Sequence, residues 1–530
     1  MTEDKTGAGG AQTPAADAAA TTTTPPRPEP KDDLVVTQHV LRTPEGELAY
    51  TATTGRIVLR EEVVKDGTYD GWKAKAEVSV TYYTLDGADV TTRPVTYAFN
   101  GGPGSSSVWL HLGLLGPRRV DAGDVGGLTP PPYGLLDNLQ TALRVTDLLF
   151  IDPMSTGYTR AAEGEKAQPY HGFKGDLESV GEVIRLWTSR HGRWMSPKFL
   201  IGESYGGTRA AALADYLQSR FGLYLNGVMM VAPALNMEAL YDAPGSLLPD
   251  PLFLPVYAAT AHYHGLFPGR TLGDVVAAAH DYADEYRVVL HRGQALDPAA
   301  RAAAARRIAA ITGLSEDYVD RANLRLEHTR VYAELLRARR LVTGRLDTRF
   351  TGPADNYLHE QMPYDPLLNA TVGPYTAALY HYLHAELESR NDAVYEVMTD
   401  KVDPWSYAEF EGRAVDVADK LAAALIANPH LAVFVAMGRY DGGVPVEAIR
   451  YSLDQMCIPA DARERIETHV YPAGHMMYVH EPSRLALSED LAAFVRRAAG
   501  QRSAEAGRRR VVGVPVGQAD ARERPRDHIT

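Results

Sequence analysis

The sequence predicts an α/β protein with a mainly parallel, doubly wound β-sheet. Short apolar runs typical of buried strands alternate with segments whose apolar residues recur at helical spacing. A serine between glycines follows one of these runs, and loops with polar side chains follow two runs nearer the C-terminus. Because the loops at the carboxyl ends of parallel strands carry the functional site, the alternation and the polar loops indicate the same architecture.

The sheet is expected to open with antiparallel strands, since residues 48–60 and 76–83 alternate apolar and polar side chains. Helical spacing is clear in Leu177–Trp187 and Thr208–Arg220. The buried strands that the apolar runs predict are Val95–Phe99, Leu148–Ile151, Phe199–Ile201, Val228–Val231, Val433–Met437 and Glu467–Tyr471.

The alternation stops between residues 242 and 400, where the patterns are helical and no apolar strand intervenes. We therefore predict a helical insertion at 242–400 that divides a core of residues 34–241 and 401–500. The polar segments 1–33 and 501–530 are predicted to be disordered tails. The helical patterns of the insertion are Val275–His291, Ala299–Ala310, His328–Leu341 and Tyr375–Met398.

The segment from Ile201 to Gly207, Ile-Gly-Glu-Ser-Tyr-Gly-Gly, has the pattern of a nucleophile elbow. In such a turn the serine takes a strained backbone conformation, and glycines at 202 and 206 let the chain pass sharply from strand to helix. Ser204 is therefore the candidate nucleophile. The amide of Tyr205, at the start of the helix, is free to face a developing oxyanion.

A serine nucleophile needs a base and a group that orients the base. Asp441 lies in a turn-rich loop after one predicted strand and His475 in a glycine-flanked loop after the next. Asp441 could instead cap the helix that starts near Pro445, and His469 and His480 compete with His475. His475 is favoured because His469 lies within a strand and His480 at a helix start. The order Ser204, Asp441, His475 predicts an α/β-hydrolase fold.

The segment Phe99-Asn-Gly-Gly-Pro-Gly-Ser-Ser-Ser107 resembles the glycine-rich signature of the serine carboxypeptidases. The Glu203-Ser-Tyr-Gly206 elbow and the Ala473-Gly-His-Met476 segment match the same family. The resemblance covers about residues 90–235 and 405–500, including Phe150-Ile-Asp-Pro153. It implies that the insertion is a cap over the active site.

The resemblance also implies roles for four residues. The amides of Gly102 and Tyr205 form the oxyanion hole, and Asn100 and Glu203 bind the free carboxylate of a peptide substrate. Because two carboxylates in contact repel, Glu203 must be protonated, so peptidase activity should favour acidic pH. This chain departs from the family at Ser105, which replaces a cysteine, at Leu114, which replaces a second acid in an ungapped reading, and at Ala98, which replaces a tryptophan.

The composition indicates which binding partners and which cellular compartment to expect for this protein. The net charge of −13 argues against a nucleic-acid partner, and no segment is long and apolar enough to span a bilayer. The single cysteine, Cys457, and an N-terminus without an apolar signal core lead us to expect a cytoplasmic enzyme. A homodimer is one oligomeric state that the sequence leaves open. No cofactor and no metal are expected, because the histidine pairs lack a further ligand: His262 with His264, His381 with His384, and His359 with Glu360.

The sequence therefore predicts a serine-type carboxypeptidase that acts on peptides through an acyl-enzyme. Two alternatives stay open. The same triad serves esterases, amidases and acyltransferases, and a non-catalytic protein would use the insertion and the tails as binding surfaces.

Overall fold

The computed structural model describes residues 29–126, 129–243 and 245–500. The tail predicted at 501–530 and residues 1–28 of the tail predicted at 1–33 lie outside this part. Residues 29–33 run along the sheet: Glu29 pairs with Arg60, and Asp32 accepts a hydrogen bond of 2.9 Å from the amide of Val58. The first strand, β1, begins at Asp33.

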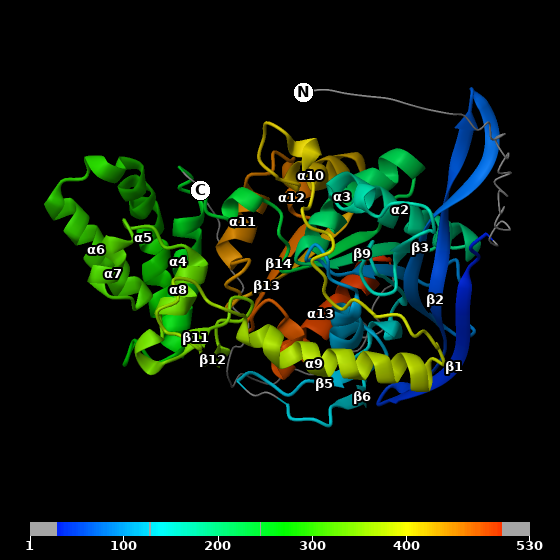
Figure 1. Cartoon of the computed structure of the whole chain (residues 1–530), viewed down its shortest axis with the longest axis horizontal. Coiled ribbons are helices and arrows are strands. Elements are labelled where there is room, and N and C mark those ends of the chain that lie inside the picture. The colour runs from blue at the N-terminus through cyan, green and yellow to red at the C-terminus, as the bar shows by residue number, and fades with distance from the viewer. Residues whose placement is uncertain (1–28, 127–128, 244, 501–530) are drawn as a thin grey trace, which may run out of the picture.

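The core is a ten-stranded sheet with the order β1-β2-β3-β7-β4-β9-β10-β13-β14, in which β8 also pairs with β3 (Figure 1). The strands from β7 to β14 are parallel, and those from β1 to β3 are antiparallel, as the alternating segments predict. The strands are β1 Asp33–Thr43, β2 Gly46–Lys65, β3 Thr68–Leu85, β4 Val95–Phe99, β7 Asp147–Ile151, β8 Arg160–Ala161, β9 Lys198–Glu203, β10 Gly227–Val231, β13 Ala432–Gly438 and β14 Ile466–Tyr471.

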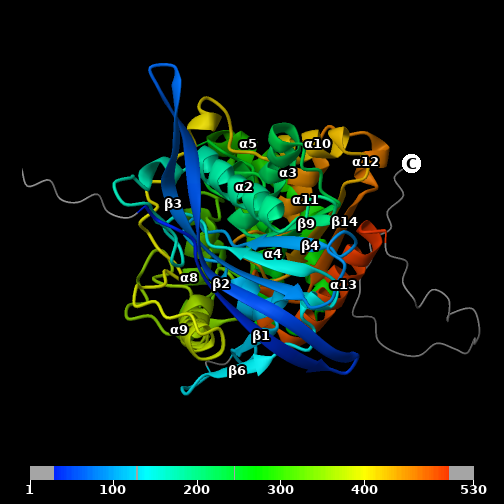
Figure 2. The same cartoon turned by 90° about the vertical axis from the view of Figure 1, so that its right-hand side faces the viewer.

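Helices cover both faces of this sheet, so its central strands are buried on both sides (Figure 2). One face packs against α2 Phe173–Arg190, α3 Tyr205–Phe221, α10 Ala418–Ala427 and α11 Val446–Asp454. The other packs against α1 Val108–Leu110, α9 Pro366–His381 and α13 Glu481–Ala498. This doubly wound arrangement, with its strand order and crossovers, is the α/β-hydrolase fold that the sequence predicts.

The insertion after β10 has two parts. Helices α4 to α8 enclose a hydrophobic cluster of their own at one end of the molecule (Figure 1). Helix α9 instead packs with the residues of the sheet domain. The first part comprises α4 Pro249–Tyr263, α5 Leu272–Arg292, α6 Pro298–Thr312, α7 Glu316–Arg321 and α8 His328–Glu334. A short hairpin of β11 Val342–Thr343 and β12 Thr351–Gly352 joins the two parts. The remaining short elements are β5 Arg118–Asp121, β6 Gly134–Asp137 and α12 Ala460–Arg463.

The insertion departs from the sequence prediction at several places, and the helix expected at His328–Leu341 ends, as α8, at Glu334. The helix expected at Tyr375–Met398 starts at Pro366 and leaves the α-helical form after His381, and Glu388, with φ of 54°, breaks the path. Glu396 instead forms a β-bridge with Gly157, and Met398 forms one with Ser105. The prediction also lacked α4, whose start is rich in proline, and the β11–β12 hairpin, whose strands have two residues each. Within the described ranges, every helix falls short of the length and apolar character that a membrane span requires.

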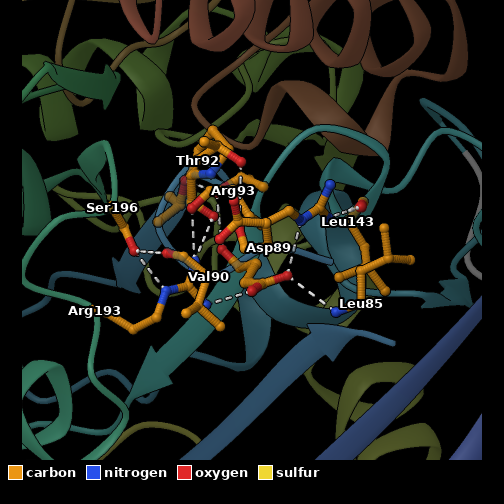
Figure 3. Close-up of polar contacts among 12 residues, drawn as sticks. Leu85, Asp89, Val90, Thr92, Arg93, Leu143, Arg193 and Ser196 are labelled. Atoms are coloured by element: carbon orange, nitrogen blue, oxygen red, sulfur yellow. Dashed lines mark hydrogen bonds and ion pairs between the residues drawn. The ribbon is translucent and has the colours of Figure 1, made fainter. Parts of the chain in front are cut away.

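A buried ion network joins the amino ends of β4, β7 and β9 (Figure 3). Asp147, the first residue of β7, accepts hydrogen bonds from Arg193 at 2.5 Å, from Arg93 at 3.0 Å and from the amide of Leu85 at 3.0 Å. Arg193 also binds the hydroxyl of Ser196 at 2.7 Å. Asp147 and Arg193 are 2% and 1% exposed, so the buried charge of each is compensated by the charge of the other. The network fixes the strand ends opposite to the polar loops.

Replacing Asp147 with alanine should lower the free energy of unfolding by about 3 kcal/mol or more, because it leaves the Arg193 guanidinium buried without its partner. Urea denaturation monitored by fluorescence measures the change. The matched control is Glu47→Ala, which removes an ion pair whose side chains are 85% and 64% exposed and should leave the urea midpoint unchanged. Equal midpoints for Asp147→Ala and the wild-type protein would contradict the role given to this network.

Candidate active site

Ser204 occupies a strained turn between β9 and α3. Its φ is 60° and its ψ is −125°, a conformation that a residue with a side chain rarely adopts. The turn closes because Gly202 has no side chain: a Cβ there would lie 2.0 Å from the carbonyl oxygen of Gly206. The side chain of Ser204 stays partly exposed. This geometry is that of the predicted nucleophile elbow.

The glycine-rich loop after β4 lies directly against this turn. A Cβ on Gly101 would be 2.4 Å from the amide nitrogen of Tyr205, so only glycine permits the approach. Gly102, with φ of 102°, is exposed next to it. In the part of the chain that the structure describes, the amides of Gly102 and Tyr205 donate to no protein group. Two free donors thus stand beside Ser204, as an oxyanion hole requires.

Asp441 and His475 form a buried hydrogen-bonded pair. The Nδ1 atom of His475 lies 2.7 Å from Oδ2 of Asp441, and the two residues are 4% and 0% exposed. The other carboxylate oxygen, Oδ1, accepts hydrogen bonds from the amides of Gly443 at 2.9 Å and Val444 at 2.8 Å. Asp441 therefore stabilises the turn before α11 and contacts the histidine. It does not cap the helix, because the N-cap of α11 is Pro445 and receives no side-chain cap, so the capping alternative is wrong.

The competing histidines lie elsewhere. His469 stacks on Phe434, with ring centroids 4.7 Å apart, and faces Asp490. His480 has its Nδ1 atom 2.7 Å from the hydroxyl of Ser483 at the start of α13. Each of these rings is thus held by a contact that does not involve Asp441.

The His475 loop is joined to the Ser204 turn through Glu203. Tyr478, three residues after His475, donates its hydroxyl to Glu203 at 2.8 Å. Among the described residues, no hydrogen bond links the Ser204 hydroxyl to His475, whose Nε2 atom has no protein partner. Such hydrogen bonds are often long or absent until a substrate is bound.

Glu203 and Asn100 form a buried hydrogen-bonded pair. The Nδ2 atom of Asn100 donates to Oε2 of Glu203 at 2.8 Å, and the two residues are 3% and 2% exposed. Burial raises the pKa of Glu203 to about 7, against the opposing influence of the nearby His475 and of the hydrogen bonds from Tyr478 and Asn100. The carboxyl group is therefore neutral at acidic pH and able to donate a hydrogen bond to an anion.

The pKa of His475 reflects its neighbours. Burial acts to lower this pKa, but the charge of Asp441, its hydrogen bond and the charge of Glu203 together raise it. When Glu203 is protonated, one of these raising charges is removed. The imidazole then remains neutral to lower pH, and a neutral imidazole is the form that accepts a proton from serine.

Two buried networks hold the loop after β4 in place. Arg209 of α3 binds Asp176 of α2 at 2.7 and 3.0 Å and donates to the carbonyl oxygen of Asn100 at 2.6 Å. Asp152 accepts the amide and the hydroxyl of Ser107 at 2.8 and 2.7 Å. No role for Asp152 was predicted from the sequence, although this residue lies in one of the segments that carry the family resemblance.

The insertion contributes directly to the site. The carbonyl oxygen of Leu346, on the β11–β12 hairpin, accepts the amide of His475 at 2.6 Å. The side chain of the neighbouring Arg345 lies beside Gly443 in the Asp441 loop. Trp405, just after the insertion, donates to the hydroxyl of Tyr205 at 3.1 Å and is partly exposed. Four residues near the site were not predicted from the sequence, namely Leu346, Arg345, Trp405 and Tyr478. Of these, only Tyr478 carries a signal, its position three residues after His475.

Two departures from the family pattern lie in the core. Ala98 and Leu114 are buried in the hydrophobic cluster on the α9 and α13 face of the sheet. Ser105 is buried as well and bridges to Met398. Tyr375 and Tyr382 are buried, and the ring centroid of Tyr375 is 4.8 Å from that of Trp109.

The histidines considered as metal ligands have other contacts. His262 and His264 lie 3.0 and 2.8 Å from the carbonyl oxygens of Arg270 and Thr348. Within the described ranges, one group has ligand atoms close enough to hold a metal ion, namely Asp242, Glu327 and His328. Glu327 already accepts two amides at the start of α8, so this group is an acidic cluster with a structural task.

Comparison with known proteins gives the family of this site. The family model for serine carboxypeptidases matches residues 65–481. Serine carboxypeptidase-like 51 and serine carboxypeptidase-like 36 of Arabidopsis thaliana are 29% and 28% identical to this chain over 29% and 28% of its length. The matched part spans 32% and 30% of these plant proteins, about a third of their length. Among solved structures, Kex1, a prohormone-processing carboxypeptidase from Saccharomyces cerevisiae, aligns with a TM-score of 0.47 and 15% identity over 86% of this chain and 91% of that one.

The geometry predicts that a fluorophosphonate labels Ser204 covalently, because the strained turn exposes its hydroxyl near a base. Labelling should be absent in Ser204→Ala and about 10³-fold slower or more in His475→Ala. His469→Ala and His480→Ala are the matched controls and should label at the wild-type rate. Mass spectrometry of the labelled peptide measures the extent and the site of labelling. Labelling that survives Ser204→Ala, or that is slowed as much in His480→Ala as in His475→Ala, would refute this assignment.

Proposed function

This chain belongs to the serine carboxypeptidase family, and we propose that it releases the C-terminal residue of peptides through an acyl-enzyme. The observation that carries this proposal is the buried pair of Asn100 and Glu203 beside Ser204. An amide and a neutral carboxyl group together offer two hydrogen-bond donors to a carboxylate. A substrate that ends in a free carboxylate matches these two donors, and an internal segment of a polypeptide does not.

In the proposed mechanism Ser204 attacks the carbonyl carbon of the last peptide bond. His475 accepts the serine proton at Nε2 and then donates it to the leaving amine, while Asp441 stabilises the imidazolium. The amides of Gly102 and Tyr205 bind the oxyanion, and each donor contributes about 10²–10³ in kcat. Water activated by His475 then hydrolyses the acyl-enzyme, which regenerates Ser204.

Substrate binding and catalysis share a dependence on pH. The Glu203 carboxyl group must carry a proton to bind the substrate carboxylate, and its pKa of about 7 implies that this proton is lost as the pH rises through neutrality. The same proton favours neutral His475. We infer that peptidase activity is highest below about pH 7 and that the limit on the alkaline side arises from binding.

The free carboxylate of the substrate should decide whether a peptide is cleaved. At acidic pH, kcat/KM for a peptide acid should exceed that for its C-terminal amide by about 10-fold or more, since the amide loses charge-assisted hydrogen bonds to Asn100 and Glu203. Liquid chromatography of the released residue measures both rates. Equal rates at every pH would overturn the carboxypeptidase proposal and would favour an esterase or amidase with the same triad.

Replacing Glu203 with glutamine should remove the pH dependence of peptide binding. In the wild-type enzyme, KM for a peptide acid should rise as the pH passes about 7, because an ionised Glu203 repels the substrate carboxylate. Glutamine stays neutral, so KM of Glu203→Gln should remain flat through this range. The control is an uncharged ester substrate, whose KM should not depend on pH in either protein. A wild-type KM that is constant across neutrality would show that Glu203 does not govern binding.

A further inference from the structure

Arg345 is held firmly beside the catalytic loops by its backbone. The amides of Arg345 and Leu346 donate to Oδ2 of Asp365 at 3.1 and 2.9 Å. The carbonyl oxygen of Leu346 accepts the amide of His475 at 2.6 Å. The position of Arg345 is thus tied to that of the histidine, although it comes from the insertion.

The guanidinium of Arg345 reaches the loop that carries Asp441. Its Nη1 atom lies 2.8 Å from the point that a Cβ of Gly443 would occupy, and Oδ1 of Asp441 lies 3.4 Å from the same point. Both oxygens of Asp441 are already taken, one by His475 and one by two amides. Asp441 is therefore a neighbour of Arg345 and not its ion-pair partner.

Arg345 differs from the arginine four residues further on. Arg349 is 7% exposed, pairs with Asp347 at 2.9 and 2.6 Å, and donates to the carbonyl oxygen of Pro472. Arg345 is partly exposed, and its side chain makes no hydrogen bond or ion pair within the described part of the chain. A guanidinium with unused donors at the rim of an active site is suited to bind a carboxylate in two-point fashion.

The strand order indicates which carboxylate this is. Asn100 follows β4 and Glu203 is the last residue of β9, and both are proposed to bind the terminal carboxylate. Asp441 and its neighbour Arg345 lie beyond the end of β13. Strand β10 lies between β9 and β13, so the two positions are about 10 Å apart, twice the spacing of about 4.8 Å between strands. One residue of an extended peptide spans about 3.3 Å. A single terminal carboxylate cannot reach both places, so Arg345 would contact a part of the substrate that precedes its last residue.

We propose that Arg345 binds the side-chain carboxylate of an aspartate or glutamate at the penultimate position of the substrate. This inference rests on the proposed carboxypeptidase function and names the class of peptide that the enzyme prefers. The same guanidinium acts to lower the pKa of His475. An effect through His475 alone would change the hydrolysis of all peptides in proportion, so the ratio between substrates separates the two roles.

The test uses three peptides that differ only in the penultimate residue, which is Glu, Gln or Lys. For the full-length wild-type enzyme, kcat/KM should decrease in the order Glu, Gln, Lys. In Arg345→Met the ratio of kcat/KM for Glu over Gln should fall by about 10-fold or more, the effect of losing a charge-assisted hydrogen bond. In Arg345→Glu the preference should transfer to the Lys peptide.

The control is Arg292→Met, which removes an exposed arginine of the same insertion at the end of α5 and should leave all ratios unchanged. A Glu over Gln ratio that is the same in wild type and Arg345→Met would overturn the inference, including the case in which all rates fall together. If the wild-type enzyme hydrolyses none of the three peptides although a fluorophosphonate labels Ser204, the proposed carboxypeptidase function itself has failed.

Discussion

The whole site depends on the close approach of two backbone segments, the loop after β4 and the turn after β9. Gly101 and Gly206 stand where any side chain would collide with the backbone: a Cβ on Gly101 would lie 2.4 Å from the amide of Tyr205, and one on Gly206 would lie 2.8 Å from the carbonyl oxygen of Phe99. The parallel register that pairs Phe99 with Gly202 brings these loops level. The strained Ser204, both free amides and the Asn100–Glu203 pair follow from this contact.

The second principle of the site is the control of one proton by burial. Glu203 lies at the end of β9, where burial raises its pKa to about 7, and it contacts the His475 loop through Tyr478. An ionised Glu203 raises the pKa of His475, and the positive charge of a protonated His475 lowers the pKa of Glu203. A neutral Glu203 favours both a bound carboxylate and a neutral base, so one protonation event prepares binding and catalysis together.

Much of this arrangement could be predicted from the sequence, because the residues concerned lie in short local patterns. The strand β4 was predicted with its observed bounds, Ser204 sits in the expected turn, and the contact of His475 with Asp441 follows from the order of the motifs. What escaped prediction depends on contacts between distant segments. Arg345 and Leu346 reach the site from the insertion, and nothing in their own surroundings in the sequence distinguishes them. The helical path ends after Glu386, and Glu396 bridges to Gly157 where the apolar spacing suggested a helix, since pairing with the core outweighs local propensity there.

The most direct measurement of the central claim is a crystal structure of the protein inhibited by a peptidyl phosphonate that ends in a free carboxylate. The account predicts a covalent bond from Ser204 to phosphorus, a phosphonyl oxygen within hydrogen-bond distance of the amides of Gly102 and Tyr205, and the carboxylate between Asn100 and Glu203. A carboxylate directed away from Glu203 into solvent, with the inhibitor nevertheless bound to Ser204, would contradict it.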